Sequence, residues 1–164
     1  MFYAKSIEAS KIPFDMLYGP AYKGIQLVTS IVIAFASLGR NVPFAFNRKE
    51  KKDHGEGGVI IGTPLKGRVL IVDDVISAGT SVNESVNLIL EEGAKPSGIA
   101  ISIDREEKGT GLLSAVEEIK ETHHLPVCHL TSLQEIMRYI EHHETYASHI
   151  IAMRDYQKVY GIKA

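Results

Sequence analysis

The chain has 164 residues, of which 45% are hydrophobic and 23% charged, and these proportions are ordinary for one globular domain with a real core. Its net charge of −2 provides no general attraction for nucleic acid, and no apolar run is long enough to cross a bilayer, so we expect neither nucleic acid nor a membrane as a partner. A single cysteine, Cys128, excludes an internal disulfide framework, and the start of the chain has no secretory signal. We therefore expect a cytoplasmic protein with a single domain over 1–164.

The first half of the chain alternates short apolar strands with a helix. We expect a buried strand at 14–19, a helix at 24–39 whose apolar residues recur at helical spacing, and a second strand at 43–47. The sequence RKEKKDHGEGG at 48–58 follows and contains no apolar residue. We expect a solvated mobile loop there, because nothing in it can pack against a core.

The second half continues the alternation of strands and helices. We expect strands at 59–62, 68–74, 98–104 and 126–130, and helices from Ser81 to Gly93 and over 112–123, 132–143 and 146–161. The strand at 68–74 is apolar on successive residues, as in parallel sheets that helices cover on both faces. The alternation predicts an α/β fold of three layers, a mostly parallel twisted sheet flanked by helices.

Two of the expected helices have features that can be checked. Ser81 and Glu84 have the spacing of a capping box, which predicts a helix start at that point. In the last helix we expect Ile150, Ile151, Met153, Tyr156 and Tyr160 to pack in the core or against another subunit.

Two adjacent carboxylates, Asp73 and Asp74, end the buried strand at 68–74, where like charges are costly. The turn VISAGTS at 75–81 follows, with small residues that let the backbone close tightly and with three hydroxyls. Because a helix begins just after it, free amides and the positive end of the helix dipole face the turn, which predicts a phosphate site. A sugar phosphate suits both features, since carboxylates accept hydrogen bonds from ribose hydroxyls, directly or through Mg²⁺, while the turn holds the 5-phosphate.

Three alternatives compete with a sugar-phosphate site at this string. The acids could cap a strand and the turn could have no ligand. A phosphorylation receiver domain also ends an apolar strand with an acidic pair, but that pair lies near the start of the domain, whereas two strands and a helix precede it here. A nucleotide-binding P-loop would need a lysine and a glycine spacing that the string lacks.

Four segments carry a resemblance to a known family. VLIVDDVISAGTS at 69–81 resembles the phosphoribosyl-pyrophosphate signature of type I phosphoribosyltransferases. YGPAYKG at 18–24 and FNRKEKKDHGEGG at 46–58 resemble motifs of the orotate phosphoribosyltransferase family, and ISIDREEKG at 101–109 resembles its base-recognition strand end. The similarity runs in order over essentially the whole chain and implies the Rossmann-like type I fold with a mobile catalytic loop.

The resemblance implies a role for each matching residue in binding substrate. Tyr22 and Lys23 would contact pyrophosphate, and Arg105 would grip the orotate carboxylate. Ser77 would also lie near the base. The residues that would hold the ribose 5-phosphate portion are Asp73, Asp74, Val75, Ile76, Ser77, Ala78, Gly79, Thr80 and Ser81.

The resemblance also assigns Arg48, Lys49, Lys52 and His54 to the catalytic loop, where they would reach into the active site of the neighbouring subunit. We expect Lys52 to contribute most to the rate. Two alternatives remain: the loop is a solvated charge run without a role, and Arg105 pairs only with nearby acids such as Asp104, Glu106 or Glu107.

The implied enzyme is a glycosyltransferase of pyrimidine biosynthesis that joins orotate to phosphoribosyl pyrophosphate, uses Mg²⁺ held through the substrate near the two aspartates, and works as a homodimer. The resemblance also implies several tens of residues before Met1, including a lysine and an aromatic pair that help hold the substrates. We therefore expect a truncated form or a start that was assigned late. Two alternative functions on the same fold are a regulator that only binds phosphoribosyl pyrophosphate, and a purine phosphoribosyltransferase, which would want an aromatic pocket in place of Arg105.

The histidines form a second candidate cluster. Two adjacent pairs lie near a cysteine: His123, His124, His142 and His143, with Cys128 and His129. A zinc site would want ligands at i and i+4 on a helix or a CxxC step, and neither is present. We expect solvated helix ends instead.

Overall fold

The structure, a computed structural model, describes residues 1–52 and 58–162 and, apart from positions 49–52, 144 and 147, their side chains. Its elements are α1 (Phe2–Ser10), β1 (Met16–Gly19), α2 (Lys23–Ser37), β2 (Phe44–Lys52), β3 (Gly58–Gly62), β4 (Arg68–Val72), α3 (Thr80–Glu91), β5 (Lys95–Asp104), α4 (Ala115–His123), β6 (Val127–Ser132), α5 (Leu133–Glu141), the 3₁₀ helix η1 (Glu144–His149) and α6 (Ile150–Tyr160). No helix of this described part is long and apolar enough to span a membrane.

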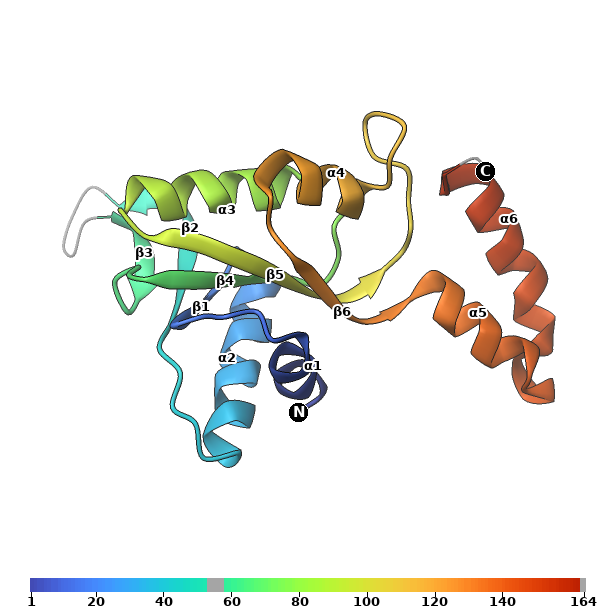
Figure 1. The fold of residues 1–164 in the computed structure, drawn as a ribbon, viewed down its shortest axis with the longest axis horizontal. Helices are drawn as coiled ribbons and strands as arrows, with labels where there is room; N and C mark the ends of the chain where they lie inside the picture. Colours follow the sequence, from blue (N-terminus) through green and yellow to red (C-terminus); the bar gives the residue numbers. More distant parts are fainter. Residues whose placement is uncertain (53–57, 163–164) are drawn as a thin grey trace.

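The strands form one sheet in the order β3-β2-β1-β4-β5-β6. Every neighbouring pair is parallel except β2 and β3, which are antiparallel. Helices α1 and α2 cover one face of the sheet, and α3 and α4 cover the other (Figure 1). The predicted three-layer α/β fold with a mostly parallel sheet is confirmed.

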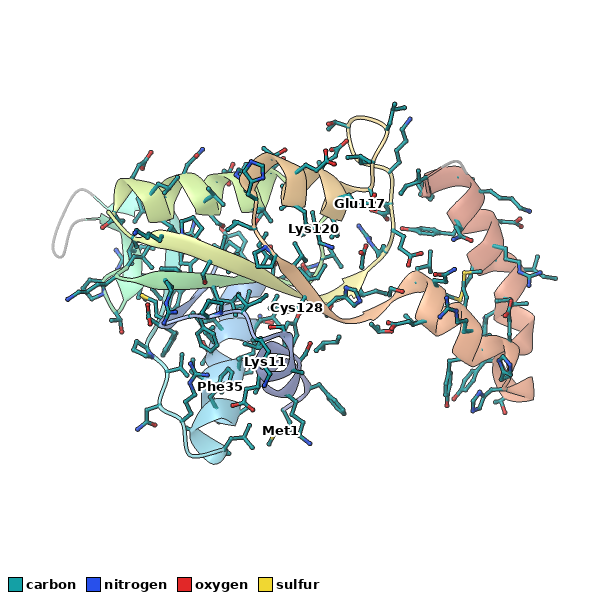
Figure 2. All side chains as sticks on the ribbon, viewed as in Figure 1. Met1, Lys11, Phe35, Glu117, Lys120 and Cys128 are labelled. Carbon is teal, nitrogen blue, oxygen red and sulfur yellow. The ribbon has the colours of Figure 1, made fainter. Side chains whose placement is uncertain are left out.

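The core explains why β4 is apolar at every position. Val69 and Ile71 belong to the cluster under α3 and α4, whereas Leu70 and Val72 belong to the cluster under α1 and α2. All four side chains are fully buried. Phe35 of α2 lies on the face that α1 and α2 cover, and Glu117 and Lys120 of α4 lie on the opposite face (Figure 2). Burial of both faces therefore holds the carboxyl end of β4 in the middle of the sheet.

The expected loop at 48–58 is wrong over its first half. Strand β2 continues to Lys52, which pairs with Gly58 of β3 in an antiparallel hairpin. The sequence misled because an edge hairpin satisfies its backbone groups by pairing, and edge strands often carry charged side chains that stay in water. The interval 53–57 lies outside the described residues.

The carboxyl-terminal helices also differ from expectation. Helix α6 begins at Ile150 after η1, and none of its residues is buried, so its expected packing in the core is wrong, while packing against another subunit stays a prediction. Helices α5 and α6 extend from β6 as an arm beside the sheet (Figure 1). Residues such as Ile151 and Val159 are exposed because their apolar spacing makes a helix face without a core beneath it.

Candidate functional site

Three segments meet at one edge of the sheet, beyond the carboxyl ends of β1, β4 and β5. These are the loop 20–23, the turn 73–81 and the residues from Arg105 onward. Strands β1, β4 and β5 are neighbours and parallel, so their carboxyl ends lie side by side. Ligands of open α/β sheets bind in this position.

Asp73 is the buried member of the acidic pair, with 8% of its surface exposed. Its carboxylate accepts hydrogen bonds from the Asp74 amide at 2.9 Å and from the Ser81 hydroxyl at 3.1 Å. Burial raises the pKa of Asp73, although these two hydrogen bonds oppose the shift. The Tyr3 hydroxyl of α1 donates to the Asp73 carbonyl at 2.7 Å, so a third element fixes the backbone at this point.

Asp74 faces the ligand side and pairs with Lys23, whose ammonium donates to its carboxylate. Partial burial raises the pKa of Asp74, but the hydrogen bond and charge of Lys23 outweigh it, and the net shift is downward. The two carboxylates thus have opposite pKa shifts. Their repulsion is relieved because one is sheltered among neutral donors while the other is paired with a cation.

The turn after the acids encloses a hollow of about 270 Å³ lined by residues 73–82. Gly79 is the N-cap of α3 and has a left-handed φ of 74°. A Cβ there would lie 2.8 Å from Ile119 Cδ1, which would have to shift, and the left-handed conformation itself favours glycine. No side chain caps α3, and its first amides therefore remain available to an anion.

Helix α3 begins near the predicted residue, at Thr80, but the expected capping box does not form. Ser81 lies inside the helix and gives its hydroxyl to Asp73. Its side chain therefore joins the turn to the acidic pair. The spacing of Ser81 and Glu84 therefore correctly predicted that a helix begins here, but it wrongly predicted how the helix is capped.

The loop 20–23 is held against β2. The Ala21 amide donates to Asn47 Oδ1 at 2.7 Å. A Cβ on Gly19 would lie 2.1 Å from the Gly24 carbonyl oxygen, which shows how tightly the chain turns here. A cavity of about 780 Å³ extends from this loop past Asn47 and Arg48 to Thr80 and Ser81 of α3. Asn47 was not predicted as a site residue, although it lies within the quoted motif at 46–58.

Arg105 follows β5 and contacts the turn 73–81. Its Nη2 donates to Ser77 Oγ and to Glu107 Oε2, each at 2.8 Å. Its Nε is buried and has no hydrogen-bond partner within the described residues. Pairing with Glu107, one of the acids named as an alternative, is thus observed, but the guanidinium still has an unused donor.

The structure brings together most of the predicted substrate residues. The turn 73–81, Lys23 and Arg105 share one edge, and Tyr22 lies beside Lys23 with 66% of its surface exposed. Of the predicted loop residues, Arg48 lines the cavity of about 780 Å³. Lys49 and Lys52 belong to strand β2. His54 lies outside the described residues.

Sequence analysis missed the residues that support the site from elsewhere. Tyr3 and Tyr156 are such residues, and Tyr156 donates to Glu107 from 49 positions away in the chain. No local pattern marks either tyrosine. Glu107 was noticed only as a possible partner of Arg105, and its link to α6 could not be foreseen.

The histidine clusters behave as expected of solvated helix ends. His123 lies at the end of α4 and contacts Asn83 Oδ1 at 2.5 Å, and His142 and His143 bind carbonyls of α5. Within 1–52 and 58–162 no group of three or more His, Cys, Asp or Glu side chains could hold a metal ion. A metal at the acidic pair would therefore need ligands from a substrate.

Comparisons with known proteins agree with this geometry. Residues 1–121 match the family model described as phosphoribosyl transferase domain. The orotate phosphoribosyltransferase of Chromobacterium violaceum is 57% identical over 161 residues, which is 98% of this chain and 75% of that protein. The orotate phosphoribosyltransferase of Thiobacillus denitrificans is 55% identical, over 98% of this chain and 76% of that protein.

A solved structure shows the same similarity in three dimensions. The orotate phosphoribosyltransferase of Francisella tularensis superposes with a TM-score of 0.82 at 36% identity, covering 98% of this chain and 77% of that one. The matched region includes every element that forms the site. From its fold, its site and these relatives, the chain belongs to the orotate phosphoribosyltransferase family of phosphoribosyltransferase-domain proteins.

Proposed function

We propose that this chain transfers ribose 5-phosphate from phosphoribosyl pyrophosphate to orotate, giving orotidine 5-phosphate and pyrophosphate. The proposal names the reaction of the family to which the chain belongs. It makes the protein a pentosyltransferase of pyrimidine biosynthesis. One relative of the same fold, from Mycobacterium tuberculosis, was solved in complex with phosphoribosyl pyrophosphate.

The sugar phosphate has a place in the turn after β4. The amides at the start of α3 and the small residues of 77–81 would hold the 5-phosphate. Asp74, the more accessible acid, would accept hydrogen bonds from the ribose hydroxyls. Lys23 would then exchange part of its pairing with Asp74 for the pyrophosphate, because both lie at the same opening.

The observation that carries the base assignment is the state of Arg105. Its side chain is 34% exposed at the site edge, so an acceptor from a ligand could reach the guanidinium. The planar guanidinium suits the carboxylate of orotate, and the Ser77 contact keeps it beside the sugar turn. A purine has no carboxylate, which disfavours the purine alternative.

Catalysis would consist of positioning and electrostatic stabilisation. As the bond to pyrophosphate lengthens, positive charge develops on the sugar and negative charge on the leaving group. Cationic groups from the hairpin would stabilise the leaving group and exclude water. These groups are Arg48, Lys49, Lys52 and His54. Retention of these cations disfavours the regulator alternative, because a sensor has no leaving group to stabilise.

The acidic pair also fits Mg²⁺ bound together with the substrate. Mg²⁺ usually takes one or two carboxylates and completes its coordination with phosphates and water. The diphosphate would hold the ion near Asp73 and Asp74, which would contact it only through water or the ribose hydroxyls. Bound there, the ion would neutralise charge on the diphosphate.

Two further parts of the proposal concern the assembly and the compartment. A homodimer would let the hairpin at β2 and β3 serve the site of the neighbouring subunit. A cytoplasmic location suits the single cysteine and a soluble nucleotide substrate. Size measurement by light scattering, with and without phosphoribosyl pyrophosphate, would test the dimer.

The reaction is tested by mixing the protein with Mg²⁺, phosphoribosyl pyrophosphate and orotate and following the loss of orotate absorbance. Hypoxanthine and adenine serve as controls. We expect turnover of orotate alone. Turnover of a purine in its place would contradict the base assignment.

Lys52→Ala tests the catalytic role of the hairpin. Removing one preorganised cation should lower kcat by about 10²–10³-fold while phosphoribosyl pyrophosphate binding changes little. Lys66→Ala is the matched control, since Lys66 lies just before β4, at the opposite end of that strand from the acidic pair. Equal effects of the two substitutions would remove Lys52 from the mechanism.

A further inference from the structure

Arg105 is joined to the last helix of the chain through one side chain. Glu107 accepts from Arg105 with Oε2, and its other oxygen, Oε1, accepts from the Tyr156 hydroxyl of α6. The Glu107 side chain is 16% exposed and that of Arg105 34%, so the pair is partly shielded from water. Two contacts of Nη2, to Ser77 and Glu107, define the plane of the guanidinium.

The backbone beside Glu107 is also attached to the end of α6. Glu107 forms an antiparallel bridge with Gly161, and the Lys108 amide donates to the Tyr160 carbonyl at 2.7 Å. These contacts and the Tyr156 hydroxyl join this part of α6 to the site edge, although no residue of the helix is fully buried. The arm is thus connected to the residue that would read the base.

We propose that Glu107 and Tyr156 are positioning residues for the Arg105 guanidinium, so that recognition of the substrate carboxylate depends on the docking of helix α6. The inference rests on the proposed function, because it takes Arg105 as the group that binds that carboxylate. It assigns to the carboxyl-terminal arm a part in base specificity.

Geometry favours positioning over simple charge pairing. A free arginine side chain samples many rotamers, and ordering it has an entropic cost that the substrate would otherwise have to supply. Contacts with Ser77 and Glu107 occupy Nη2, and 34% of the Arg105 side chain remains exposed. The fixed plane therefore keeps donors available for a second carboxylate.

Tyr156 would limit the cost of placing a carboxylate so near an anion site. Its hydroxyl engages the Glu107 oxygen that Arg105 does not use, so both oxygens already accept a hydrogen bond. The hydrogen bond to Glu107 also raises the pKa of Tyr156, which keeps the phenol protonated and donating. The other acids nearby are engaged differently, since Asp104 accepts from the Glu106 amide at 2.9 Å.

The test compares two nucleotides that differ only in the carboxylate. Affinities for orotidine 5-phosphate and uridine 5-phosphate are measured by calorimetry for the wild-type chain and for Tyr156→Phe. We expect Tyr156→Phe to weaken orotidine 5-phosphate binding by about 3- to 10-fold and to leave uridine 5-phosphate binding within about 2-fold, the scale of one lost hydrogen bond.

Tyr160→Phe is the matched control. Tyr160 lies on the same helix, its ring centroid is 4.8 Å from that of Tyr156, and its hydroxyl has no hydrogen bond within the described part of the chain. It should leave both affinities unchanged. Glu107→Gln provides a second variant, in which one oxygen and the charge are lost, and it should weaken orotidine 5-phosphate binding by about 3- to 10-fold as well.

Parallel losses for both nucleotides would show that Tyr156 is merely structural, and would overturn the inference. Tighter orotidine 5-phosphate binding by Glu107→Gln would do the same, because Glu107 would then be a competitor of the substrate. If the wild-type chain discriminates between the nucleotides and Tyr156→Phe changes nothing, the inference alone fails. A wild-type chain that binds both equally would overturn the proposed function together with the inference.

Discussion

The two halves of the site are built in different ways. The sugar half is one continuous segment, 73–81, attached to a strand buried on both faces. The base half is assembled from Ser77, Arg105, Glu107 and Tyr156, which belong to three distant parts of the chain. A segment on a rigid strand needs little outside help, whereas a flexible arginine at a strand end needs partners to define its direction. The substitutions below separate these two halves.

The largest effect is expected from Gly79→Val, in the sugar half. The left-handed φ and the contact with Ile119 force the turn to change, so the amides at the start of α3 lose the phosphate. Loss of two charge-assisted hydrogen bonds predicts at least about a 100-fold weaker affinity for phosphoribosyl pyrophosphate, measured by calorimetry. Gly39→Val is the control, since Gly39 also has a positive φ but no atom within 4 Å of the added Cβ.

The next effect is expected from Arg105→Lys, in the base half. Lysine keeps the charge but not the planar fork, so the preference for orotidine 5-phosphate over uridine 5-phosphate should fall by about 10- to 100-fold. Binding of phosphoribosyl pyrophosphate should stay nearly unchanged. A similar loss for the sugar diphosphate would show that the two halves are not separate.

Ser77→Ala should have an intermediate effect on both halves, because Ser77 belongs to the turn and also accepts from Arg105. We expect KM to rise by about 3- to 10-fold for each substrate, the scale of one typical hydrogen bond. Steady-state kinetics with each substrate varied in turn would measure this. An effect on only one KM would assign Ser77 to one half.

The smallest effect is expected from Tyr3→Phe, which removes the α1 support of Asp73. Loss of this hydrogen bond should lower the free energy of unfolding by about 0.5–1.5 kcal/mol in a urea titration at neutral pH. Burial raises the pKa of Tyr3 from 10.0 to about 12. A raised pKa means that the folded state holds the Tyr3 proton more tightly than the unfolded state does. The stability that comes from this difference is therefore complete below pH 10 and is lost as the pH rises through about 12.

A spectrophotometric titration of tyrosinate checks the same assignment. The titration curve of the wild-type protein should contain one more ionising phenol than that of Tyr3→Phe, and this phenol should ionise at a pH of about 12. Tyr139→Phe is the control, because it also removes one phenol and Tyr139 is exposed. A Tyr3 difference at the usual pH would show that the phenol is not buried in solution.

Some parts of the fold could be predicted because their cause is local. The continuous apolar run of β4 predicted a strand covered on both faces, and the small residues with hydroxyls predicted the turn and the helix after it. The extent of β2 and the exposure of α6 could not be predicted in this way. Charged residues suit an edge hairpin as well as a loop, and an apolar helix face does not reveal whether anything covers it.

The sequence by itself determined the α/β fold, the acidic pair with its turn, and the presence of an arginine at the end of β5. These depend on the order of residues along a few turns of chain, where side-chain size, charge and backbone freedom act directly. Only the tertiary structure decided that Lys23 neutralises Asp74, that Ser81 serves Asp73 instead of a cap, and that Tyr156 reaches Arg105 through Glu107. Such contacts join residues far apart in the chain, and the packing of whole strands and helices brings them within hydrogen-bond distance.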